Sequence, residues 1–597
     1  MNPFLLTDFY KLTHILQYRP ELRELTSYLT PRGSRLKGVD KVVFFGLSAY
    51  VHSYVVKNFN DNFFNRNFEY CECEIREVLE LGLGYSDEMI DRTINAFRAL
   101  HELHYLPVEI NAVAEGTLVP MGVPCIEIKS TDPQFFWVGQ ALEASLSSAI
   151  WHPMVSATIA REYRKIARDA KNATVEPNID ERTFMCDFSM RGQESNESAV
   201  NASVAWLTSM WNSSTVAARK HIKDVYTKLS TRDKMSNSII RGLTSTEHSV
   251  MTSHTCLDGG DEIPTFKYLF DLYKNVSFAA VCDSYDFWNV LTNILPNNFM
   301  KEIDARGKRG VFIGVRHDSA EPVDALCGTV PVITATDVKE LPDNMLDGDE
   351  KLYAISITLE EMERIRSLNV CGKVAIGEKD LVYQIQTING DGFLRHITSD
   401  GNEIGWAVAS CLNRPRTWEE KGMVETMYEI FGGSVNSKGY KVLNPGIKAV
   451  YGDSITITRA KKIYERLATK GFAANNVSLG VGSFSFQGLE NEDGTISLFS
   501  RDTFSIAVKC THSKYEDEHG TVCERWVYKS PKNFSQKKSQ RGLCQIYFGE
   551  NGELTYKDEK YENDLIGANS ALIPYFRDGK EYKQNFEAIR ETIDEKL

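Results

Sequence analysis

The chain has 597 residues and a formal net charge of −13, with 42% hydrophobic and 25% charged residues, which is typical of a soluble globular protein of roughly two to four domains. The acidic balance argues against nucleic acid as an obligatory partner, and no apolar run is long enough to span a bilayer. The first residues lack the features of a signal peptide, and the twelve scattered cysteines have neither zinc nor disulfide spacing, so we expect free thiols in a cytoplasmic protein.

The first 150 residues predict helices beside a small antiparallel sheet. Thr7 or Asp8 can cap an opening helix that carries Tyr10 about half a turn from Asp8. After a helical stretch, three runs with alternating apolar side chains read as strands, at 106–113, 117–120 and 124–128. A long helix over 135–170 then leads into a region of different character.

Four apolar runs in the rest of the chain end in polar residues of similar chemistry. Each run lacks polar alternation, which is typical of a short strand buried on both faces. The runs end in Asp-Ser, Arg-His-Asp-Ser, Gly-Asp-Ser and Gly-x-Gly-Ser, and they cover residues 278–284, 311–319, 447–454 and 476–483. Because the carboxyl ends of parallel strands form the ligand crevice of α/β folds, this recurrence predicts a β/α barrel with its site at one rim.

Arg316 and Asp318 are the most informative pair in these runs. They lie two residues apart, so they point to the same side if the strand continues. A guanidinium group can bind a phosphate through two hydrogen bonds, and a carboxylate can accept hydrogen bonds from ribose hydroxyls. The alternative for a lone Arg-x-Asp-Ser is a solvated salt bridge at a strand end, and the recurrence in the other runs favours a binding site.

Three further features are candidates for binding or catalysis. Phe188 and Arg191 follow a strand-like run and could supply a stacking face and an anion contact. His248 lies between a glutamate and a hydroxyl residue, which suits an acid, a base or a nucleophile, although a lone histidine is more often structural. The basic run 529–541 is either a solvated face or the cover of a polyphosphate. The metal ligands, if any, are unknown from the sequence.

Residues 323–420 interrupt the alternation of strands and helices. The segment contains short strand-like runs joined by acidic turns, and the alternation resumes near Trp418. We therefore expect an inserted β-rich subdomain, to which the sequence assigns no role.

Together, these motifs resemble those of the nicotinamide phosphoribosyltransferases, members of the type II phosphoribosyltransferase family. The resemblance covers most of the chain outside the insert, and the order and spacing of the motifs agree. It rests on T-D-x-Y-K at 7–11, D-F-x-x-R-G at 187–192, E-H-S at 247–249, D-S-Y-D at 283–286, R-x-D-S at 316–319, G-D at 452–453, G-x-G at 480–482, R-D at 501–502 and the basic run.

The resemblance implies an α/β fold, in which an incomplete α/β barrel lies beside an antiparallel β-sheet domain built from both chain ends. The expected domains are residues 1–150 completed by 505–597, the barrel of 151–322 and 421–504, and the inserted β-rich subdomain 323–420. The resemblance also implies a homodimer with active sites at the interface.

The implied activity is transfer of the phosphoribosyl group of phosphoribosyl pyrophosphate to nicotinamide, which gives nicotinamide mononucleotide and pyrophosphate in NAD salvage. Phe188 of one subunit and Tyr10 of the other are expected to sandwich the pyridine ring. The expected catalytic residues are His248, Asp283, Arg316 and Asp318, of which the two aspartates bind ribose hydroxyls. The other residues implied in substrate binding are Asp8, Arg191, Ser214, Gly452, Asp453, Gly482, Ser483 and Arg501.

The resemblance further implies two cofactors. Mg²⁺ is expected to bind mainly through phosphoribosyl pyrophosphate and to shield its charge. ATP is expected to act as an activating co-substrate that phosphorylates His248 and so couples its hydrolysis to synthesis. The cations that the resemblance places near the polyphosphate are Arg32, Lys509, Lys529 and Lys538.

Two departures from the family pattern concern substrate binding. Ser214 stands where the family has an aspartate that accepts from the carboxamide nitrogen, so the choice between nicotinamide and nicotinate stays open. The glycine-rich phosphate turn becomes Gly482-Ser483-Phe484, which weakens the case for a nest of backbone amides. A catalytically silent binding dimer is the alternative from another functional class, and the joint presence of the four expected catalytic residues disfavours it.

Overall fold

The computed structural model describes all residues except 228–239, 334, 342–350, 360–361, 363–371, 378–379, 386–392, 398–402, 453, 492–493 and 531–538. The chain separates into two compact units. Unit 1 comprises Met1–Lys165, Cys186–Gly242 and Gly482–Leu597, and unit 2 comprises Ile166–Met185 and Leu243–Val481. None of the helices in the described residues has both the length and the hydrophobicity needed to span a membrane. The domain boundaries expected from the sequence stay a prediction.

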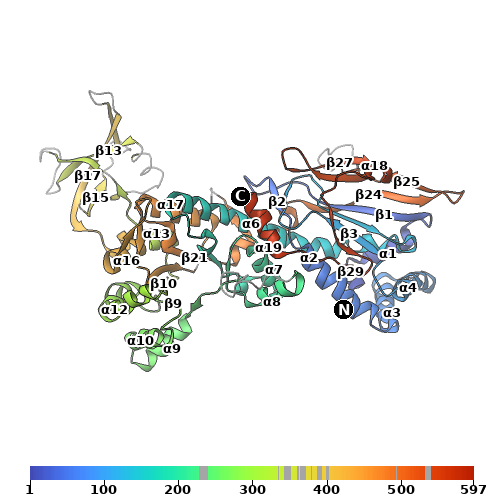
Figure 1. Cartoon of the computed structure of the whole chain (residues 1–597), viewed down its shortest axis with the longest axis horizontal. Helices are drawn as coiled ribbons and strands as arrows, with labels where there is room; N and C mark the ends of the chain where they lie inside the picture. The colour runs from blue at the N-terminus through green and yellow to red at the C-terminus, as the bar shows by residue number, and fades with distance from the viewer. Residues whose placement is uncertain are drawn as a thin grey trace. The chain divides into compact units, whose positions relative to one another are not determined.

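Unit 1 is built around a seven-stranded antiparallel sheet with the order β25-β24-β1-β5-β3-β28-β29 (Figure 1). Strands from the N-terminal part of the chain form its middle and strands from the C-terminal part form its two edges, so that blue β1 lies beside red β24. The strands are β1 (Leu22–Pro31), β3 (Val108–Ala112), β5 (Ile126–Ser130), β24 (Ile506–Glu516), β25 (Val522–Trp526), β28 (Ile573–Arg577) and β29 (Lys580–Glu581). This confirms the antiparallel sheet domain expected from both chain ends.

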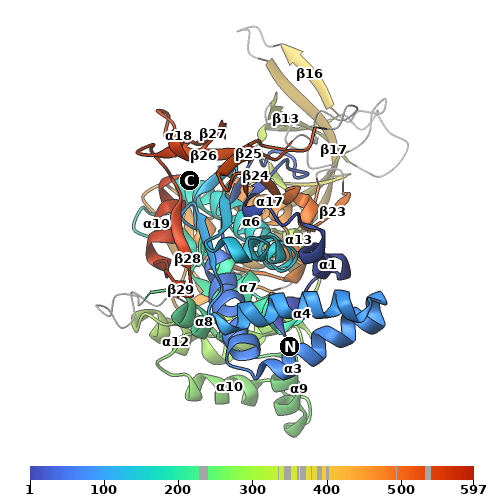
Figure 2. The ribbon, with the colours of Figure 1, turned by 90° about the vertical axis from the view of Figure 1, so that its right-hand side faces the viewer.

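The helices of unit 1 follow the predicted order. The opening helix α1 covers Phe9–Gln17, and α3 (Phe68–Glu77) and α4 (Asp87–Glu102) pack against each other in the helical stretch (Figure 2). The predicted long helix is realised as α5 (Val138–Ala141) and α6 (Glu143–Thr174). Side chains of β3 alternate between buried and partly exposed, as the sequence pattern predicts for a strand with one face on the core.

Unit 2 contains the curled parallel sheet of an incomplete α/β barrel. Strands β21-β20-β10-β9-β8 are neighbours in it, and every pairing between them is parallel. They are β8 (Thr244–Ser245), β9 (Phe278–Val281), β10 (Ile313–His317), β20 (Ile447–Tyr451) and β21 (Val477–Val481). All four apolar runs of the sequence are therefore adjacent strands of one sheet, which confirms the predicted fold class.

Helices connect these parallel strands along the chain. They include α9 (His248–Leu257) and α10 (Ile263–Leu272) between β8 and β9, and α12 (Leu295–Lys308) between β9 and β10. Helix α17 (Ile457–Thr469) connects β20 to β21. This connectivity brings the carboxyl ends of the strands to one edge of the sheet.

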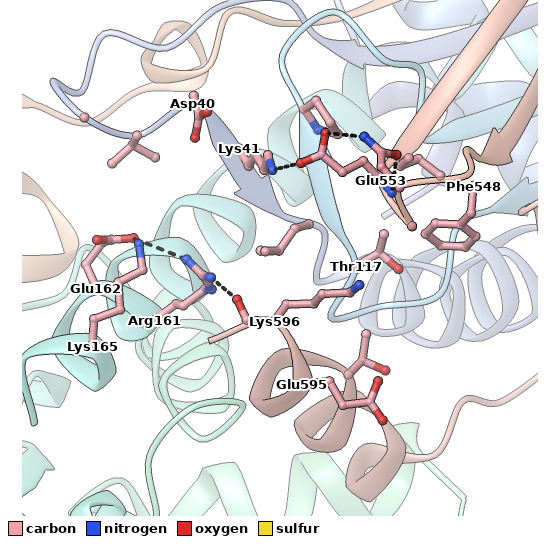
Figure 3. Close-up of a pocket in the computed structure, with 18 residues that line it drawn as sticks. Asp40, Lys41, Thr117, Arg161, Glu162, Lys165, Phe548, Glu553, Glu595 and Lys596 are labelled. Atoms are coloured by element: carbon pink, nitrogen blue, oxygen red, sulfur yellow. Dashed lines mark hydrogen bonds and ion pairs between the residues drawn. The ribbon is translucent and has the colours of Figure 1, made fainter. Parts of the chain in front are cut away.

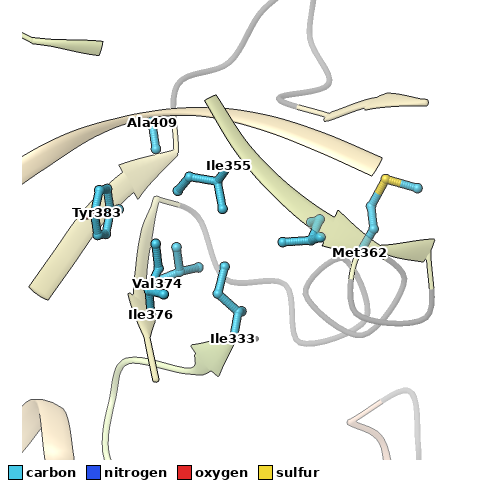
Figure 4. Packing of buried hydrophobic residues seen from close by; sticks show 8 residues of the cluster. Ile333, Ile355, Met362, Val374, Ile376, Tyr383 and Ala409 are labelled. Atoms are coloured by element: carbon cyan, nitrogen blue, oxygen red, sulfur yellow. The ribbon is translucent and has the colours of Figure 1, made fainter. Parts of the chain in front are cut away.

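The insert within unit 2 is a mainly antiparallel sheet with its own hydrophobic core (Figure 4). Its strands are β11 (Val332–Ile333), β12 (Ala335–Glu340), β13 (Leu352–Thr358), β14 (Lys373–Ile376), β15 (Leu381–Ile385), β16 (Phe393–Ile397) and β17 (Glu403–Pro415). Its core comprises Ile333, Ile355, Ile357, Met362, Val374, Ile376, Tyr383 and Ala409. The predicted β-rich character of the insert is therefore confirmed, and the helix α15 (Trp418–Lys421) follows β17.

Candidate active site

Five of the expected site residues gather at the carboxyl ends of the parallel strands in unit 2. Asp283 follows β9, Asp318 follows Arg316 at the end of β10, and Gly452 follows β20. His248 is the first residue of α9, just after β8. We call these residues, His248, Asp283, Arg316, Asp318 and Gly452, the rim cluster. Its position is the one at which α/β folds bind their ligands.

Arg316 and Asp318 form a bidentate ion pair. Arg316 Nε donates to Asp318 Oδ1 at 2.8 Å, and Nη2 lies 2.6 Å from Oδ2. Both side chains are largely buried. The pair confirms the predicted placement of the two residues on one side of the strand. It also fixes the guanidinium plane, because a bidentate pair restrains both groups in orientation.

Gly452 is required by the position of this ion pair. A Cβ atom at residue 452 would lie 2.8 Å from Arg316 Nε and 2.8 Å from Asp318 Oδ1. Those distances are shorter than a carbon atom can approach either group without displacement. The glycine therefore allows the ion pair to lie directly against the backbone that follows β20.

Asp283 links the loops that follow β9 and β10. Its Oδ2 accepts hydrogen bonds from Asp318 N at 2.9 Å, Ser319 N at 2.9 Å and Ser319 Oγ at 2.6 Å, and its side chain is only 4% exposed. Burial alone would raise the pKa of Asp283, but the hydrogen bonds from Ser319 and Asp318 lower it below the ordinary value. The carboxylate is therefore ionised at neutral pH.

The second oxygen of Asp283 faces His248. Oδ1 lies 3.3 Å from His248 Nε2, and the histidine side chain is 52% exposed. This contact is electrostatic, since Oδ1 accepts no hydrogen bond in the described part of the chain. The arrangement gives a solvent-accessible imidazole a fixed carboxylate neighbour, which suits proton or phosphoryl chemistry.

His317 is a rim residue that the sequence interpretation left unassigned. It occupies the variable position of Arg-x-Asp-Ser, and its ring stacks on Phe287 with 4.0 Å between centroids. It is buried, and burial lowers its pKa. His317 is therefore a neutral core residue that packs between Phe287 and Tyr451.

A second group of expected residues lies in unit 1. We call Phe188, Arg191, Ser214 and Ser483 the loop cluster. Phe188 follows β6 (Met185–Asp187), and Arg191 lies in the 3-10 turn Met190–Gly192. Ser214 follows β7 (Asn212–Ser213), which pairs in parallel with Asp187 and Cys186. The ends of these two short strands therefore hold Phe188 and Ser214 next to each other.

The close approach of Gly192 to Ser483 joins the last member to this cluster. A Cβ atom at residue 192 would lie 2.1 Å from Ser483 Oγ and 2.7 Å from its Cβ. Only glycine fits such a contact, so the turn that carries Arg191 lies on Ser483. Gly482 precedes it with φ −81° and ψ −179°, and Gly480 belongs to β21 rather than to a turn.

Three of the expected cations group in unit 1 as well. Burial lowers the pKa of Lys509, and the charges of Arg32, Lys11 and Arg501 lower it further, whereas Glu143 opposes them. Arg32 Nε donates to the carbonyl of Ser505 at 3.2 Å, which anchors its guanidinium beside β24. We call Arg32, Lys509 and Arg501 the cation cluster. Its mutual repulsion makes it a place where an anion would bind.

The remaining expected residues belong to none of these three clusters. Tyr10 is 57% exposed on α1, and Asp8 stands at the N-cap of that helix without capping it through its side chain. Lys529 is exposed, and its backbone pairs with Ser539. Lys538 and Asp453 lie outside the described residues. Among the described residues, no group of three or more His, Cys, Asp and Glu side chains is placed to hold a metal ion.

Unit 1 also contains a cavity of about 650 Å³ that is separate from the expected site residues (Figure 3). Four cationic and four acidic side chains line it. Lys41 pairs with Glu553 across it, and Lys165 pairs with Glu162 at 2.7 Å. Because these charges compensate one another, the cavity lacks the excess positive charge that a pyrophosphate group requires.

Two family models match the chain. One, described as the nicotinate phosphoribosyltransferase (NAPRTase) family, covers residues 184–355 and 400–562, which hold the whole of the rim cluster and of the loop cluster. The other, the nicotinamide phosphoribosyltransferase N-terminal domain, covers residues 2–72, including α1 and Tyr10.

Individual proteins resemble the chain over most of its length. The nicotinamide phosphoribosyltransferase of Acinetobacter baylyi is 27% identical, and the match covers 100% of this chain and 98% of that protein. The nicotinamide phosphoribosyltransferase of Mycoplasma pneumoniae is 26% identical, with 86% and 90% covered. Among solved structures, nicotinate-nucleotide pyrophosphorylase from Pyrococcus furiosus is a distant match, with 13% identity, a TM-score of 0.47 and coverage of 99% and 94%. Because the first of the two family models spans more than half of the 597 residues, the chain belongs to the nicotinate phosphoribosyltransferase (NAPRTase) family.

Proposed function

We propose that this protein transfers the phosphoribosyl group of phosphoribosyl pyrophosphate to nicotinamide, which yields nicotinamide mononucleotide and pyrophosphate in NAD salvage. The names of the relatives from Acinetobacter baylyi and Mycoplasma pneumoniae support this reaction, since both matches extend over most of each chain. The observation that carries the choice of base is the hydrogen bonding of Ser214.

The Ser214 hydroxyl donates its hydrogen to the main-chain carbonyl of Asp187 at 3.0 Å. A carbonyl oxygen only accepts, so the serine oxygen retains lone pairs and has no further proton to donate. The carboxamide of nicotinamide has an NH₂ group that can donate to this oxygen, whereas the carboxylate of nicotinate only accepts. In this arrangement Ser214 favours the amide in the same sense as the aspartate that the family has at this position.

Base choice is tested by a competition assay with equal nicotinamide and nicotinate, phosphoribosyl pyrophosphate and Mg²⁺, with and without ATP. Nicotinamide mononucleotide should be the main product. Ser214→Asp should raise the preference for the amide about ten- to a hundredfold, because a charged acceptor strengthens the hydrogen bond and repels the carboxylate.

Ser253→Asp is the matched control for this assay. Ser253 is an exposed serine on α9 whose hydroxyl also donates to a main-chain carbonyl, that of Val250 at 3.1 Å, so the product ratio should not change. Nicotinate mononucleotide as the main wild-type product would transfer the protein to the sister activity. No product from either base would favour a catalytically silent dimer.

The rim cluster provides the charges that phosphoribosyl transfer needs. The reaction breaks the bond between the anomeric carbon and a pyrophosphate oxygen and forms a bond to the pyridine nitrogen. Positive charge develops on the ribose in the transition state, and negative charge develops on the leaving group. We assign ribose hydroxyl binding to Asp283 and Asp318 and phosphate binding to Arg316, whose orientation the ion pair already fixes.

Mg²⁺ would arrive with phosphoribosyl pyrophosphate. Oδ2 of Asp283 already accepts three hydrogen bonds, and both oxygens of Asp318 pair with Arg316. Because these carboxylate oxygens are already engaged, we expect phosphate oxygens and water to supply most of the ligands of the ion. When bound, the ion supplies positive charge to the pyrophosphate group, and the cation cluster is our candidate for further neutralisation.

ATP stimulation is assigned to His248. Transfer of the γ-phosphoryl group of ATP to a ring nitrogen of His248 would release ADP, and hydrolysis by water would return the imidazole and orthophosphate. The exposed position of His248 at the start of α9 and its contact with Asp283 support this role.

The exposed ring of Tyr10 supports a homodimer. Among the described residues of one chain, the contacts found for the Tyr10 ring are those with its neighbours Lys11 and His14 on α1, and neither of these is assigned to base binding. We propose that Tyr10 of each subunit completes the base site of the other. Mixing Tyr10→Ala with Phe188→Ala, each nearly inactive alone, should then restore activity through mixed dimers with one intact site. Failure of the mixture to regain activity, with subunit exchange confirmed by differently tagged chains, would contradict this arrangement.

A further inference from the structure

We infer that Asp187 is a positioning residue for the base, because its carboxylate and its carbonyl together fix Phe188 and Ser214. This inference rests on the proposed function, in which these two residues bind the pyridine ring and its amide. Asp187 itself touches no substrate in this role. It acts through the two residues that it holds.

The carboxylate of Asp187 is fully buried, at 0% exposure, and is held by hydrogen-bond donors alone. Oδ2 accepts from Ser203 Oγ at 2.5 Å and from Ser213 Oγ at 2.7 Å, and Oδ1 accepts from Ser189 N at 2.8 Å. In the described part of the chain, no lysine or arginine pairs with it. A buried charge without a cation is retained only where several donors stabilise it, so these contacts form a built network.

This network determines the backbone around Phe188. The bond from Ser189 N to Asp187 Oδ1 closes a turn that contains Phe188 as its central residue. The carboxylate that closes this turn is itself anchored, since the two serines that donate to its other oxygen belong to α7 (Asn196–Trp206) and to β7. The direction in which the Phe188 ring leaves the backbone is thereby set by Asp187.

The same residue also determines the orientation of Ser214. The carbonyl oxygen of Asp187 accepts from both Ser214 N at 2.9 Å and Ser214 Oγ at 3.0 Å. Ser213 Oγ, which donates to the carboxylate, in turn accepts from Thr215 N at 3.1 Å at the start of α8 (Val216–Val225). One residue therefore holds the stacking ring and the amide acceptor at a fixed separation.

Asp187→Asn tests this role with the smallest change in shape. The amide oxygen can still accept from Ser189 N, which preserves the turn, but the NH₂ group then meets the two serine hydroxyls, which must reverse. We expect the KM for nicotinamide to rise about tenfold, because small displacements of binding groups are costly, while the KM for phosphoribosyl pyrophosphate stays within about twofold. The kcat at saturating nicotinamide should change less than the KM.

Glu115→Gln is the matched control. Glu115 is also a buried carboxylate in unit 1, and it accepts from Gly46 N at 2.8 Å, Ser48 N at 3.0 Å and Ser48 Oγ at 3.0 Å. These contacts stabilise the start of α2 (Leu47–Tyr50), which carries no expected base contact. Loss of one of these acceptor oxygens should lower the melting temperature without a selective change in the KM for nicotinamide.

Two further variants keep the inference testable if Asp187→Asn does not fold. Ser203→Ala and Ser213→Ala each remove one donor to the carboxylate, and each should raise the KM for nicotinamide selectively, by about threefold. Equal changes in both KM values, or a pattern like that of Glu115→Gln, would reduce Asp187 to a structural residue. An active wild type with unchanged nicotinamide KM in all three variants would overturn the inference alone. A wild type inactive with both bases would overturn the proposed function, and the positioning role with it.

Discussion

Replacing Arg316 by alanine should reduce kcat/KM for nicotinamide mononucleotide formation on the order of 10³-fold, which is the scale of losing one positioned charge in a transition state. The guanidinium is the cation of the rim cluster, and it is oriented by two contacts with Asp318 at 2.8 and 2.6 Å. Its removal deletes the proposed phosphate contact and leaves the largely buried Asp318 without its partner. Steady-state product formation with both substrates varied would measure the effect.

Two control variants separate a specific role of Arg316 from a general loss of stability. Arg316→Lys keeps the charge but not the planar fork, so its activity should lie between those of wild type and Arg316→Ala. Arg309 lies just before the other end of β10 and pairs with Glu302 at 2.5 Å. Arg309→Ala should therefore leave turnover unchanged. Near-wild-type kinetics of Arg316→Ala would remove this residue from the active site.

The parallel sheet could be predicted from the sequence because its strands are buried on both faces. Such strands appear as unbroken apolar runs, and all four runs became neighbouring parallel strands. The polar residues that follow them then had to meet at one edge. The Arg316–Asp318 pair was predictable for the same reason, since side chains two apart on a strand point the same way.

Contacts between distant residues could not be predicted in this way. Gly192 and Ser483 are separated by 290 intervening residues, and nothing near either of them in the sequence indicates that they touch. The donors to Asp187 are serines with no regular spacing, so the D-F-x-x-R-G motif was interpreted through Phe188 and Arg191 alone. The hydrogen-bond direction of Ser214 likewise depends on the pairing of β6 and β7, which brings the Asp187 carbonyl within reach.

Replacing His248 by alanine should abolish the stimulation by ATP while basal synthesis of nicotinamide mononucleotide continues. The imidazole is the proposed phosphoryl acceptor, and alanine has no nucleophile. Binding of both substrates should persist, because the Asp283 bonds to Asp318 and Ser319 do not involve the histidine. The measurement is the initial rate with and without ATP, together with phosphate release and acid-sensitive labelling from γ-labelled ATP.

His254→Ala provides the matched control for this prediction. His254 lies on the same helix, α9, but its ring packs on Tyr268 of α10 with 5.0 Å between centroids. That variant should keep both the stimulation and the label. Continued acceleration of His248→Ala by ATP would show that another group accepts the phosphoryl group.

Asp283, the neighbour of His248, should not cause any pH dependence of the ATP effect near neutral pH. The folded-state pKa of Asp283 is lowered, so its ionised form stabilises the folded protein above the ordinary aspartate value of about 3.9, and this stabilisation is lost as pH falls through the lower folded value. Between pH 6 and 8, taken as roughly the working range of a histidine, the carboxylate thus stays charged. Any loss of ATP stimulation in that range must then come from a group other than Asp283. The measurement is the initial rate of synthesis against pH, with and without ATP, for the wild type and His248→Ala. If the wild type loses its ATP stimulation on acidification while the basal rates of both proteins stay unchanged, the titrating group acts in the ATP-dependent step.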